Sequence, residues 1–325
     1  MSVALDLQEI YRPVADDLER LYELLHRELR SDDPFVGELV AHVLAARGKL
    51  VRPALALLSA AAAGGADEQR LWLAGTVELI HIASLIHDDV IDAADLRRGV
   101  STVNVLWGNQ LAVLLGDYLF ATAFDLVSRM RHPQVAPTIA RAAVAMSEAE
   151  ILATKVGGEP YEDDAIYFRI IEGKTARLVA AACRAGALVA GAGPAVADAL
   201  EAFGLAWGMC FQITDDALDL VGDPQAMGKP IGSDIDTGKT TLPVIAALRA
   251  APPGDRDRLR ALVRGEAGGL ADLQALVHRY DGVRQALEVA RTYADRAVAA
   301  LQPLPPGPAR ASLEALTAFV LVRAR

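Results

Sequence analysis

The chain has 325 residues, of which 53% are hydrophobic and only 5% aromatic. This alanine- and leucine-rich composition favours packed helices over a sheet rich in valine and tyrosine, so we expect an all-α protein. The net charge of -10 and the pI near 5.1 exclude a surface built for nucleic acid, which needs clustered lysine and arginine.

Apolar residues recur at helical spacing along most of the chain. The pattern predicts helices over residues 3–30, 35–47, 52–63, 68–93, 103–131, 135–155, 164–192 and 195–221. Residues 222–241 differ, because glycines there alternate with lysines and aspartates, and they predict a polar loop. Helical patterning resumes at Pro243 and continues to Arg325, with interruptions at residues 252–255 and 303–308.

No tract has the composition of an interdomain linker, so the sequence predicts one all-α domain spanning residues 1–325. Apolar stretches such as residues 178–183 and 185–192 are too short to cross a bilayer, and the N-terminal region lacks the pattern of a signal peptide. We therefore expect a cytoplasmic protein without a transmembrane segment. Cys183 and Cys210 lie in apolar helical surroundings without CxxC spacing, which predicts buried, reduced thiols.

Two aspartate clusters share one spacing, DDVID at residues 88–92 and DDALD at residues 215–219. Residues three and four apart share a helix face, so three carboxylates converge in each cluster. The residues concerned are Asp88, Asp89, Asp92, Asp215, Asp216 and Asp219. A solvated helix face is the simplest alternative, but aspartate is a poor helix former and like charges at this spacing destabilise a helix. Magnesium prefers oxygen ligands and leaves positions for phosphates, so the clusters predict a magnesium-bound diphosphate.

Two other metal sites are possible in principle for these acidic residues. A calcium loop needs alternating ligands around a glycine and a closing glutamate, and neither cluster has that pattern. A di-iron bundle uses Glu-x-x-His pairs, which occur at Glu23 with His26 and at Glu78 with His81. The di-iron alternative would leave all six aspartates unexplained.

A diphosphate also needs cations, and the chain places lysine and arginine next to glycine or proline in five segments. These are residues 48–53 (GKLVRP), 97–99 (RRG), 173–175 (GKT), 228–230 (GKP) and 238–243 (GKTTLP). Arginine binds two phosphate oxygens at once, lysine supplies a mobile charge, and glycine lets the backbone approach a ligand. The basic segments therefore complement the two acidic clusters.

In order and spacing, these motifs resemble those of the trans-isoprenyl diphosphate synthase family, and the resemblance covers essentially the whole chain. It implies the isoprenoid synthase fold, a single large helical bundle around a central active-site cavity. It also implies a magnesium-dependent prenyltransferase that elongates an allylic diphosphate, farnesyl or geranylgeranyl diphosphate, with isopentenyl diphosphate. Three magnesium ions, a homodimer and transient membrane contact during product release are expected on the same ground.

The resemblance assigns a role to each matching residue. The six aspartates would hold the metal, and with Lys174 and Lys229 they form the expected catalytic set. Isopentenyl diphosphate would bind Lys49, Arg52, His81 and Arg98. The allylic diphosphate would bind Arg97, Lys174, Lys229 and Lys239, and Thr175, Phe211 and Gln212 would line the reacting carbons. Residues 157–162 (GGEPYE) depart from the family pattern, which has a glutamine shortly after the glutamate, so the local substrate contacts are expected to differ there.

Product length depends on how far the growing chain can extend along the helix that carries Asp88. Ala83 and Ser84 lie about one turn earlier and are small, whereas short-chain members of the family place an aromatic residue there. The sequence therefore resembles enzymes that make long products of the heptaprenyl kind, used as quinone side chains. Candidate residues for the floor of the product pocket are Phe120, Phe124 and Met146.

Three alternatives to the long-chain synthase stay open. The nearest is a short-chain farnesyl or geranylgeranyl diphosphate synthase, which differs only in product length. A terpene cyclase would share the fold, but paired DDxxD motifs and the basic residues for isopentenyl diphosphate are not expected in it. A non-catalytic partner subunit would have lost aspartates, and all six are present.

Overall fold

The computed structural model of the chain describes residues 6–46, 48–65, 67–221, 238–266 and 268–322. Contacts gather the chain into two compact units. Unit 1 comprises Met1–Ala143, Leu178–Gly204 and Ala300–Leu316, and unit 2 comprises Val144–Arg177, Leu205–Ala299 and Thr317–Arg325. The expectation of a single domain concerns how these units join, and it stays a prediction.

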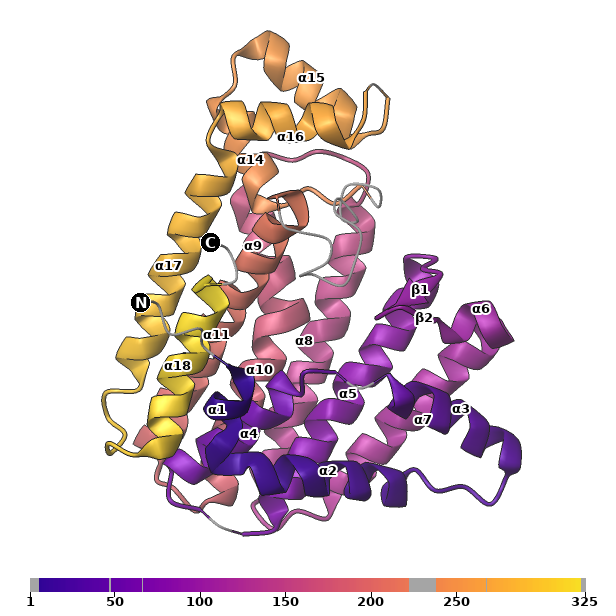
Figure 1. Cartoon of the computed structure of the whole chain (residues 1–325), viewed down its shortest axis with the longest axis vertical. Helices are drawn as coiled ribbons and strands as arrows, with labels where there is room; N and C mark the ends of the chain where they lie inside the picture. The colour runs from indigo at the N-terminus through magenta and orange to yellow at the C-terminus, as the bar shows by residue number, and fades with distance from the viewer. Residues whose placement is uncertain (1–5, 47, 66, 222–237, 267, 323–325) are drawn as a thin grey trace. The chain divides into compact units, whose positions relative to one another are not determined.

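Helices make up the N-terminal part of unit 1 (Figure 1). They are α1 (Leu7–Tyr11), the short 3-10 helix η1 (Arg12–Val14), α2 (Ala15–Glu28), α3 (Pro34–Ala45), α4 (Val51–Ala62), α5 (Gln69–Ile91), α6 (Val103–Trp107) and α7 (Asn109–Ser128). Two predicted helices are interrupted. Pro13 lies in η1 between α1 and α2, and Gly108, with φ of 86°, separates α6 from α7. Both breaks use residues that disfavour a continuous helix.

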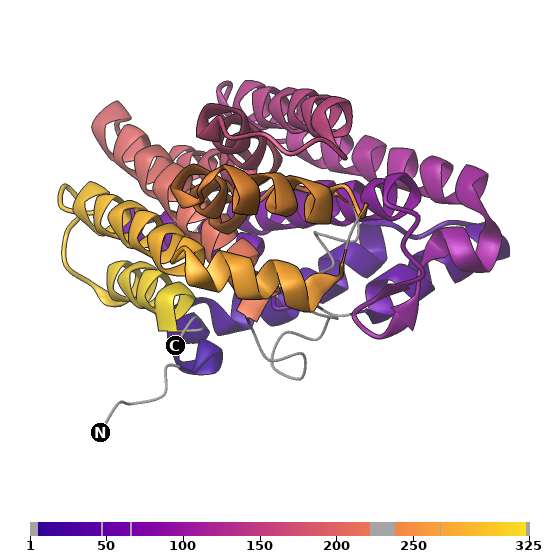
Figure 2. The same ribbon diagram turned by 90° about the horizontal axis from the view of Figure 1, so that it is seen from above.

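The central helix of unit 1 is α5, which packs along α7 (Figures 1 and 2). Leu73, Val77 and Ile80 on α5 are fully buried, and Leu119 on α7 is 1% exposed. The helices approach closely at Gly116, where an added Cβ would lie 2.1 Å from Nε2 of His87. The turn of α5 that carries the first aspartate cluster is therefore fixed against α7.

A small antiparallel hairpin follows α5, which the helical pattern did not predict. Strand β1 (Leu96–Arg97) pairs with β2 (Val100–Ser101) in the register Arg97 opposite Val100. The turn consists of Arg98 and Gly99, with φ of 53° and 80°. Positive φ at both central residues is typical of a tight two-residue hairpin turn, so the RRG motif forms a defined turn rather than a flexible loop.

Several helices contain residues of both units, namely α8 (Val135–Val156), α10 (Arg177–Val189), α11 (Pro194–Val221), α17 (Gly282–Ala300) and α18 (Pro308–Val322). Within unit 2 lie α9 (Asp164–Ile171), the π-helix η2 (Glu172–Ala176), α14 (Leu242–Ala250), α15 (Pro253–Val263) and α16 (Leu270–Arg279). The predicted helix over residues 164–192 is thus a run of α9, η2 and α10. Its π-helical turn coincides with the GKT motif.

The C-terminal part of unit 2 is divided more finely than the sequence pattern predicted. Gly265, Gly268 and Asp281 have positive φ and separate α15, α16 and α17. Helices α14, α15 and α16 pack on one another around a buried cluster. Its members include Leu220, Val244, Leu248, Leu259, Leu273 and Val277.

Helix α7 has 20 residues and a mean hydropathy of 1.6, so by length and composition alone it could cross a membrane. The sequence analysis considered shorter apolar stretches and did not identify α7 as long enough to cross a membrane. One side of α7, with Ala112, Leu115 and Ala123, is buried in unit 1. This packing accounts for the apolar character of that side without a bilayer.

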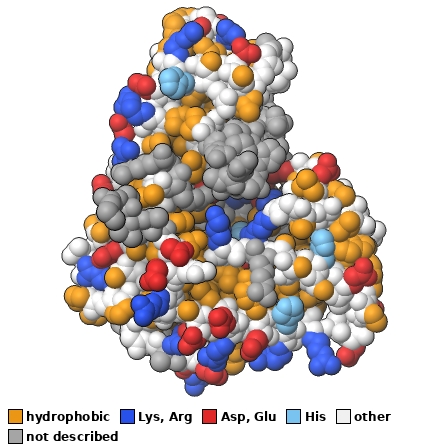
Figure 3. Space-filling model, in the orientation of Figure 1, with side chains coloured by type: hydrophobic (Ala, Val, Ile, Leu, Met, Phe, Trp, Pro, Cys, Tyr) orange, Lys and Arg blue, Asp and Glu red, His pale blue; other side chains and the backbone are white. Residues whose placement is uncertain are grey.

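Charged side chains of both signs alternate along the lower edge of the face in Figure 3, where α2 lies. Ion pairs such as Arg20 with Glu68 (2.8 Å) and Arg129 with Glu28 (2.9 Å) belong to this part of unit 1. Basic residues are therefore interspersed with acidic ones there. The all-α prediction is confirmed, because helices form nearly all of the described secondary structure.

Candidate active site

The first aspartate cluster lies at the C-terminal end of α5. Asp89 is buried, with 5% of its surface exposed, while Asp88 and Asp92 are half-buried. Asp92 is the C-cap residue, and its N–H donates to the carbonyl of Asp88. A helix C-terminus carries partial negative charge, which makes this the least favourable helix end for three carboxylates. Cations are therefore needed to stabilise the ionised cluster.

One such cation is Arg97 of the hairpin. Its Nε donates to Oδ1 of Asp89 over 2.6 Å, and its Nη2 lies 2.6 Å from the same oxygen. Burial raises the pKa of Asp89, while Arg97 opposes that rise. The structure thus brings a predicted ligand of the allylic diphosphate into contact with a predicted metal ligand.

The residues expected to bind isopentenyl diphosphate gather on another part of unit 1. Nη1 of Arg52, in the first turn of α4, lies 3.2 Å from Nε2 of His81 on α5. Burial lowers the pKa of His81 well below its usual range, and Arg52, Arg98 and Arg97 lower it further. His81 is therefore neutral at physiological pH, and its Nε2 can accept the hydrogen bond from Arg52.

Arg98 and Lys49 complete this basic group. Nη1 of Arg98 donates to the carbonyl of Ala46 over 2.8 Å. An added Cβ at Gly48 would lie 2.7 Å from both terminal nitrogens of Arg98, so a side chain at this position would displace that guanidinium. The carbonyl of Lys49 accepts a 3.1 Å hydrogen bond from the hydroxyl of Tyr11. The GKLVRP and RRG motifs thus meet through Gly48 and Arg98.

The second aspartate cluster lies near the C-terminal end of α11. Asp216 and Asp219 are buried, with 5% and 1% exposure, and Asp215 is half-buried. Both oxygens of Asp216 accept hydrogen bonds, Oδ1 from Nε2 of Gln212 over 2.8 Å and Oδ2 from the hydroxyl of Tyr167 over 2.6 Å. The carboxylate plane of Asp216 is therefore fixed by two donors.

The GKT motif joins this network from the π-helix η2. The hydroxyl of Thr175 donates to Oε1 of Gln212 over 2.8 Å, so a continuous chain of hydrogen bonds runs from Thr175 to Asp216. Nζ of Lys174 lies 2.6 Å from Oε2 of Glu150 on α8. Gly173 packs against α8, where an added Cβ would lie 2.5 Å from the Cβ of Ala149. π-helical turns are frequent at functional sites, and this one sets the orientation of Lys174 and Thr175.

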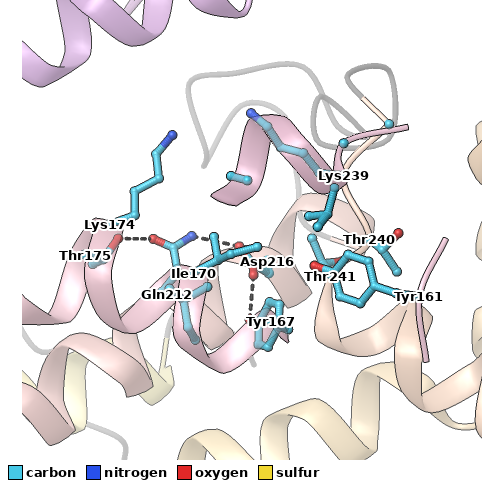
Figure 4. A pocket seen from close by; sticks show the side chains of 15 residues that line it. Tyr161, Tyr167, Ile170, Lys174, Thr175, Gln212, Asp216, Lys239, Thr240 and Thr241 are labelled. Carbon is cyan, nitrogen blue, oxygen red and sulfur yellow. Dashed lines mark hydrogen bonds between the residues drawn. The ribbon is translucent and has the colours of Figure 1, made fainter. Parts of the chain in front are cut away.

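These side chains surround a pocket of about 140 Å³ in unit 2 (Figure 4). Its lining includes Tyr161, Tyr167, Ile170, Lys174, Thr175, Gln212, Asp216, Lys239, Thr240 and Thr241. Lys174 and Lys239 extend toward the same side of the pocket, while Tyr167 and Gln212 contact Asp216 below them in the view. Phe211 does not line the pocket but stacks on Trp207 with ring centroids 5.1 Å apart.

The atypical segment at residues 157–162 forms one edge of the pocket. The N–H of Gly158 donates to the carbonyl of Gly238 over 3.2 Å, which joins this segment to the GKTTLP motif. Glu162 accepts from Nη2 of Arg260 over 2.6 Å. Tyr161 turns into the pocket, where burial and the charge of Asp216 raise its pKa to about 12. The residues that depart from the family pattern therefore lie in defined positions at the edge of the pocket.

Sequence reasoning assigned no site role to three residues that contact the predicted site or line its pocket, namely Glu150, Tyr161 and Tyr167. Tyr167 lies seven residues before Lys174, a separation close to two helical turns, and this is the one sequence feature that could have indicated it. The π-helical turn and the contacts between α8 and η2 leave no comparable pattern in the sequence.

The predicted chain-length residues lie in different surroundings. Ala83 is fully buried on α5, and the hydroxyl of the half-buried Ser84 donates to the carbonyl of His81. Phe120 on α7 faces the ring of His87 with centroids 5.9 Å apart. The other two candidates differ in exposure, Phe124 being 38% exposed and Met146 9%. Lys229 lies outside the described residues.

Comparison with known proteins now decides the family. The model of the family described as "Polyprenyl synthetase" matches residues 33–280. The chain belongs to the polyprenyl synthetase family. It is 38% identical, over 97% of its length and 98% of the relative's, to "Heptaprenyl diphosphate synthase component 2" of Geobacillus stearothermophilus. It is 39% identical, over 87% of the chain and 88% of the relative, to "Short chain isoprenyl diphosphate synthase" of Methanothermobacter thermautotrophicus.

A solved structure extends the likeness to the fold. The polyprenyl synthase of Caulobacter crescentus, crystallised with calcium and isoprenyl diphosphate, superposes with a TM-score of 0.93. It is 34% identical in sequence, and the match covers 100% of this chain and 99% of that one. The expected isoprenoid synthase fold is confirmed, and that structure was solved in complex with a divalent cation, calcium.

The donor groups of this chain fit a divalent cation of the kind used in the polyprenyl synthetase family. Within the described residues, no three histidine, cysteine, aspartate or glutamate side chains form a ready metal cluster. Magnesium usually takes one or two carboxylates and completes its shell with water and phosphate oxygens, so a protein cluster of three is not required. Asp216 is oriented by two donors, and an ionised carboxylate is an acceptor group of the kind that a divalent cation binds.

The di-iron alternative is not supported by the arrangement of its two Glu-x-x-His pairs. Glu23 and His26 are exposed on α2, whereas Glu78 is buried on α5. His81 contacts the guanidinium of Arg52, a cation that would repel iron. His81 instead belongs to the basic group of unit 1.

Proposed function

We propose that the chain is a trans-prenyltransferase that elongates farnesyl or geranylgeranyl diphosphate with isopentenyl diphosphate to a long-chain all-trans polyprenyl diphosphate. The observation that carries the proposal is the chain of hydrogen bonds from Thr175 through Gln212 to Asp216, in a pocket also lined by Lys174 and Lys239. A lysine-lined pocket with an oriented carboxylate suits a diphosphate bound with a cation.

In this proposal the six aspartates hold magnesium, three ions as the family resemblance implies. When bound, the metal would stabilise the negative charge that develops on the leaving diphosphate. Lys174, Lys239 and Arg97 would bind that diphosphate, together with Lys229. Arg97 would exchange its contact with Asp89 for one with the phosphate oxygens. Asp89 would then be free to bind the cation.

The reaction needs no nucleophile from the protein. The C–O bond of the allylic diphosphate breaks, and its electron pair leaves with diphosphate. The double bond of isopentenyl diphosphate, held by Lys49, Arg52, His81 and Arg98, supplies the pair for the new carbon–carbon bond. The released diphosphate takes the proton that is then lost, and a longer allylic diphosphate results. The protein contributes orientation and electrostatic stabilisation.

Long products are proposed because Ala83 and Ser84, about one turn before Asp88 on α5, have small side chains that would not block a growing prenyl chain. The heptaprenyl kind, as the side chain of a quinone, is the product we favour. The floor of the product pocket would come from Phe120, Phe124 or Met146. Phe120 is better enclosed than Phe124, which is 38% exposed. A protein with such a product would work in the cytoplasm and contact a membrane transiently to release it.

A homodimer is proposed on an exposed apolar surface of unit 1. Val105 and Leu106 on α6 are 49% and 47% exposed, and Val113 and Leu114 on α7 are 41% and 54% exposed. Apolar side chains grouped on neighbouring helices are typical of protein interfaces. Size-exclusion chromatography with light scattering tests the dimer, and Leu114→Glu should dissociate it. A monomeric wild-type protein that gains activity only with a second subunit would favour a heteromeric synthase.

The reaction class is tested by measuring diphosphate release in the presence of magnesium. A synthase should release diphosphate from farnesyl diphosphate only when isopentenyl diphosphate is also present. Release from farnesyl diphosphate alone would indicate a terpene cyclase. Absence of release with both substrates, and with geranyl or geranylgeranyl diphosphate as the primer, would indicate a non-catalytic partner subunit.

A further inference from the structure

The segment of residues 157–164 (GGEPYEDD) departs from the family pattern, and the proposed reaction assigns its side chains no role. The segment carries acidic residues on both sides of a single aromatic one, Tyr161. It has no regular secondary structure until α9 begins at Asp164. The contacts that other elements make with this segment therefore decide where Tyr161 lies.

Arginines of α14 and α15 hold the part of the segment that follows Tyr161. Nε of Arg249 donates to the carbonyl of Glu162 over 3.0 Å, and Nη1 of the same arginine lies 2.7 Å from Oδ2 of Asp164. Nη2 of Arg260 donates to Oε1 of Glu162 over 2.6 Å. A single exposed ion pair contributes little, but several contacts on one short segment restrict it together.

The part of the segment that precedes Tyr161 is held as well. Nη2 of Arg264 on α15 lies 3.1 Å from Oε2 of Glu159. The N–H of Gly158 donates to the carbonyl of Gly238 over 3.2 Å. An added Cβ at Gly238 would lie 3.0 Å from the Cα of Gly158, so the two backbones are in contact. Tyr161 is thus fixed by contacts on both sides of it in the chain.

The segment contributes the side chain of Tyr161 to the pocket of unit 2. The half-buried Tyr161 lines this pocket together with Thr240, and Figure 4 shows it on the same side as Lys239. Among the described residues, no hydrogen bond holds the hydroxyl of Tyr161, whereas the hydroxyl of Tyr167 donates to Asp216. A phenol keeps its proton at neutral pH, so Tyr161 has a donor to offer to a ligand.

A second hydroxyl of the pocket also lacks a partner. Thr240 is 3% exposed, and its Oγ1 has no hydrogen bond within the part of the chain that the structure describes. A buried hydroxyl without a partner is unfavourable. Lys174 and Lys239 line the same pocket, which therefore combines hydroxyl donors with positive charge. The ligand that suits it is an anion with several acceptor oxygens, as a diphosphate has.

We propose that Tyr161 is a substrate-contacting residue that donates its hydroxyl hydrogen to the diphosphate of the allylic substrate, and that Arg249 and Arg260 are positioning residues that hold it in the pocket. The inference rests on the proposed function and deepens it, because Lys174 and Lys239 are assigned there to the same diphosphate. Helices α14 and α15 thereby affect binding through residues that do not touch the substrate.

The contact is tested by Tyr161→Phe, which keeps the ring and removes the hydroxyl. We expect KM for the allylic diphosphate to rise about tenfold, the usual effect of losing a hydrogen bond to a charged group, and KM for isopentenyl diphosphate to change less than about twofold. Inorganic diphosphate with magnesium is the probe that lacks a prenyl chain. Its inhibition constant against the allylic substrate should rise in the same proportion.

Two results would overturn the contact between Tyr161 and the diphosphate. One is an unchanged KM for the allylic substrate in Tyr161→Phe, or an equal rise in the Michaelis constants of both substrates. The other is a higher KM for the allylic substrate with an unchanged inhibition constant for inorganic diphosphate, because the hydroxyl would then act on the prenyl chain.

The positioning role is tested by replacing Arg249 and Arg260 together with glutamine. We expect KM for the allylic diphosphate to rise about threefold or more, as several partly exposed contacts are lost together, and KM for isopentenyl diphosphate to stay the same. Added to Tyr161→Phe, the two substitutions should raise KM little further, because the hydroxyl that they position is already absent. Full additivity with Tyr161→Phe would overturn the positioning role.

Arg258 and Arg279 provide the matched control, because they form ion pairs of 2.8 Å and 3.1 Å that join α15 to α16 and do not involve residues 157–164. Replacing both with glutamine should leave both Michaelis constants unchanged. A rise equal to that of the Arg249 and Arg260 variant would mean that any loss of ion pairs in these helices has the same effect, and the positioning role would fail.

Failure of the proposed function is distinguishable from failure of this inference. A wild-type protein without prenyl transfer would refute the proposed function. The rise in unfolding temperature that magnesium and inorganic diphosphate produce can still be measured in that case. Tyr161→Phe should reduce this rise, whereas the control variant of Arg258 and Arg279 should keep it. An equal rise in Tyr161→Phe and in the wild type would overturn the contact.

Discussion

Arg97 donates to Asp89 across 2.6 Å, so a side chain expected to bind phosphate neutralises one expected to bind metal. A similar pairing occurs in unit 2, where Lys174 lies 2.6 Å from Glu150. Each cation is thus held by an acid, and in the proposed reaction it would exchange partners when substrate binds. In the proposed reaction a metal cation would replace the basic side chain beside Asp89, and the diphosphate would replace the acid beside each basic side chain.

Asp89→Asn tests whether this carboxylate is retained for chemistry at the expense of stability. Burial raises the pKa of Asp89 in the folded protein. Ionisation of Asp89 therefore destabilises the folded state at pH values above the usual pKa of an aspartate. The amide should therefore raise the unfolding temperature at pH 8, and the gain should shrink as the pH falls and Asp89 becomes protonated in the folded state. Activity should fall about 100-fold or more, because a metal ligand is lost.

Circular dichroism melting at pH 5 and pH 8, with the elongation rate, checks this prediction. A lower unfolding temperature at pH 8 would mean that the ion pair with Arg97 outweighs the cost of burial. Undiminished activity would remove Asp89 from the metal site.

Tyr167→Phe removes one of the two donors that fix Asp216 while keeping the aromatic ring and its contact with Phe168. We expect the turnover number to fall about tenfold or more, the usual cost of losing a hydrogen bond to a charged group, and more magnesium to be needed for half-maximal activity. Thermal stabilisation by magnesium with a non-hydrolysable allylic analogue should weaken in parallel.

Tyr280→Phe is the control for Tyr167→Phe, since Tyr280 also donates to an aspartate, Asp255, but does not line the pocket. Its activity should equal that of the wild type. Equal effects of the two substitutions would show that a tyrosine–aspartate contact anywhere in unit 2 has the same consequence, and Tyr167 would lose its special role.

Gly173→Ala tests the close approach of the GKT motif to α8. The added Cβ would lie 2.5 Å from the Cβ of Ala149 and 2.8 Å from the carbonyl oxygen of Ala145, so η2 must shift. A displacement of this kind typically costs about 1–3 kcal/mol and would misalign Lys174 and Thr175. We expect a lower unfolding temperature and a rise in KM for the allylic substrate. Gly254→Ala, whose added Cβ meets nothing within 4 Å, should be tolerated.

Substitution of Ser84 is the cleaner test of product length. Ala83 is fully buried, so phenylalanine there would overpack the core of unit 1 as well as block the product. Ser84 is half-buried, and Ser84→Phe should shorten the products while preserving most of the stability. Chromatography of the dephosphorylated products measures the length. Products of unchanged length from Ser84→Phe would contradict a product path along this part of α5.

The two cysteines should be inert in the native protein. Burial raises the pKa of Cys183 and of Cys210 to about 12, so little thiolate exists at neutral pH. Iodoacetamide at pH 7.5 should leave both unmodified by intact mass until denaturant is added, because the thiolate is the reactive form. Rapid alkylation of either thiol in the folded protein would contradict its burial.

Helical periodicity and the spacing of charged motifs predicted the all-α fold and located both aspartate clusters on helices. The pattern could not predict the hairpin at Arg98 and Gly99, because two-residue strands have no detectable alternation. The π-helical turn at Lys174 could not be predicted either, because its residues are of types that also occur in α-helices. Some helix boundaries, such as the one at Asp281 between α16 and α17, depend on a single residue with a left-handed backbone conformation.

Site residues were predictable where a charged motif carries them and not where a neutral or buried side chain supports them. Arg52 and His81 were expected, and the structure brings them into contact. Tyr167 and Glu150 contact predicted residues from positions that tertiary packing alone creates. A sequence pattern shows which chemistry is present, whereas the supporting contacts depend on which helices meet.

The most direct test of the central claim is the product of prolonged incubation with magnesium, labelled isopentenyl diphosphate and farnesyl diphosphate. After dephosphorylation, the products should form a ladder that ends sharply at a long chain, of about the heptaprenyl length. Products that stop at geranylgeranyl would contradict long-chain synthesis and favour the short-chain enzyme. Absence of any elongated product would contradict prenyl transfer itself.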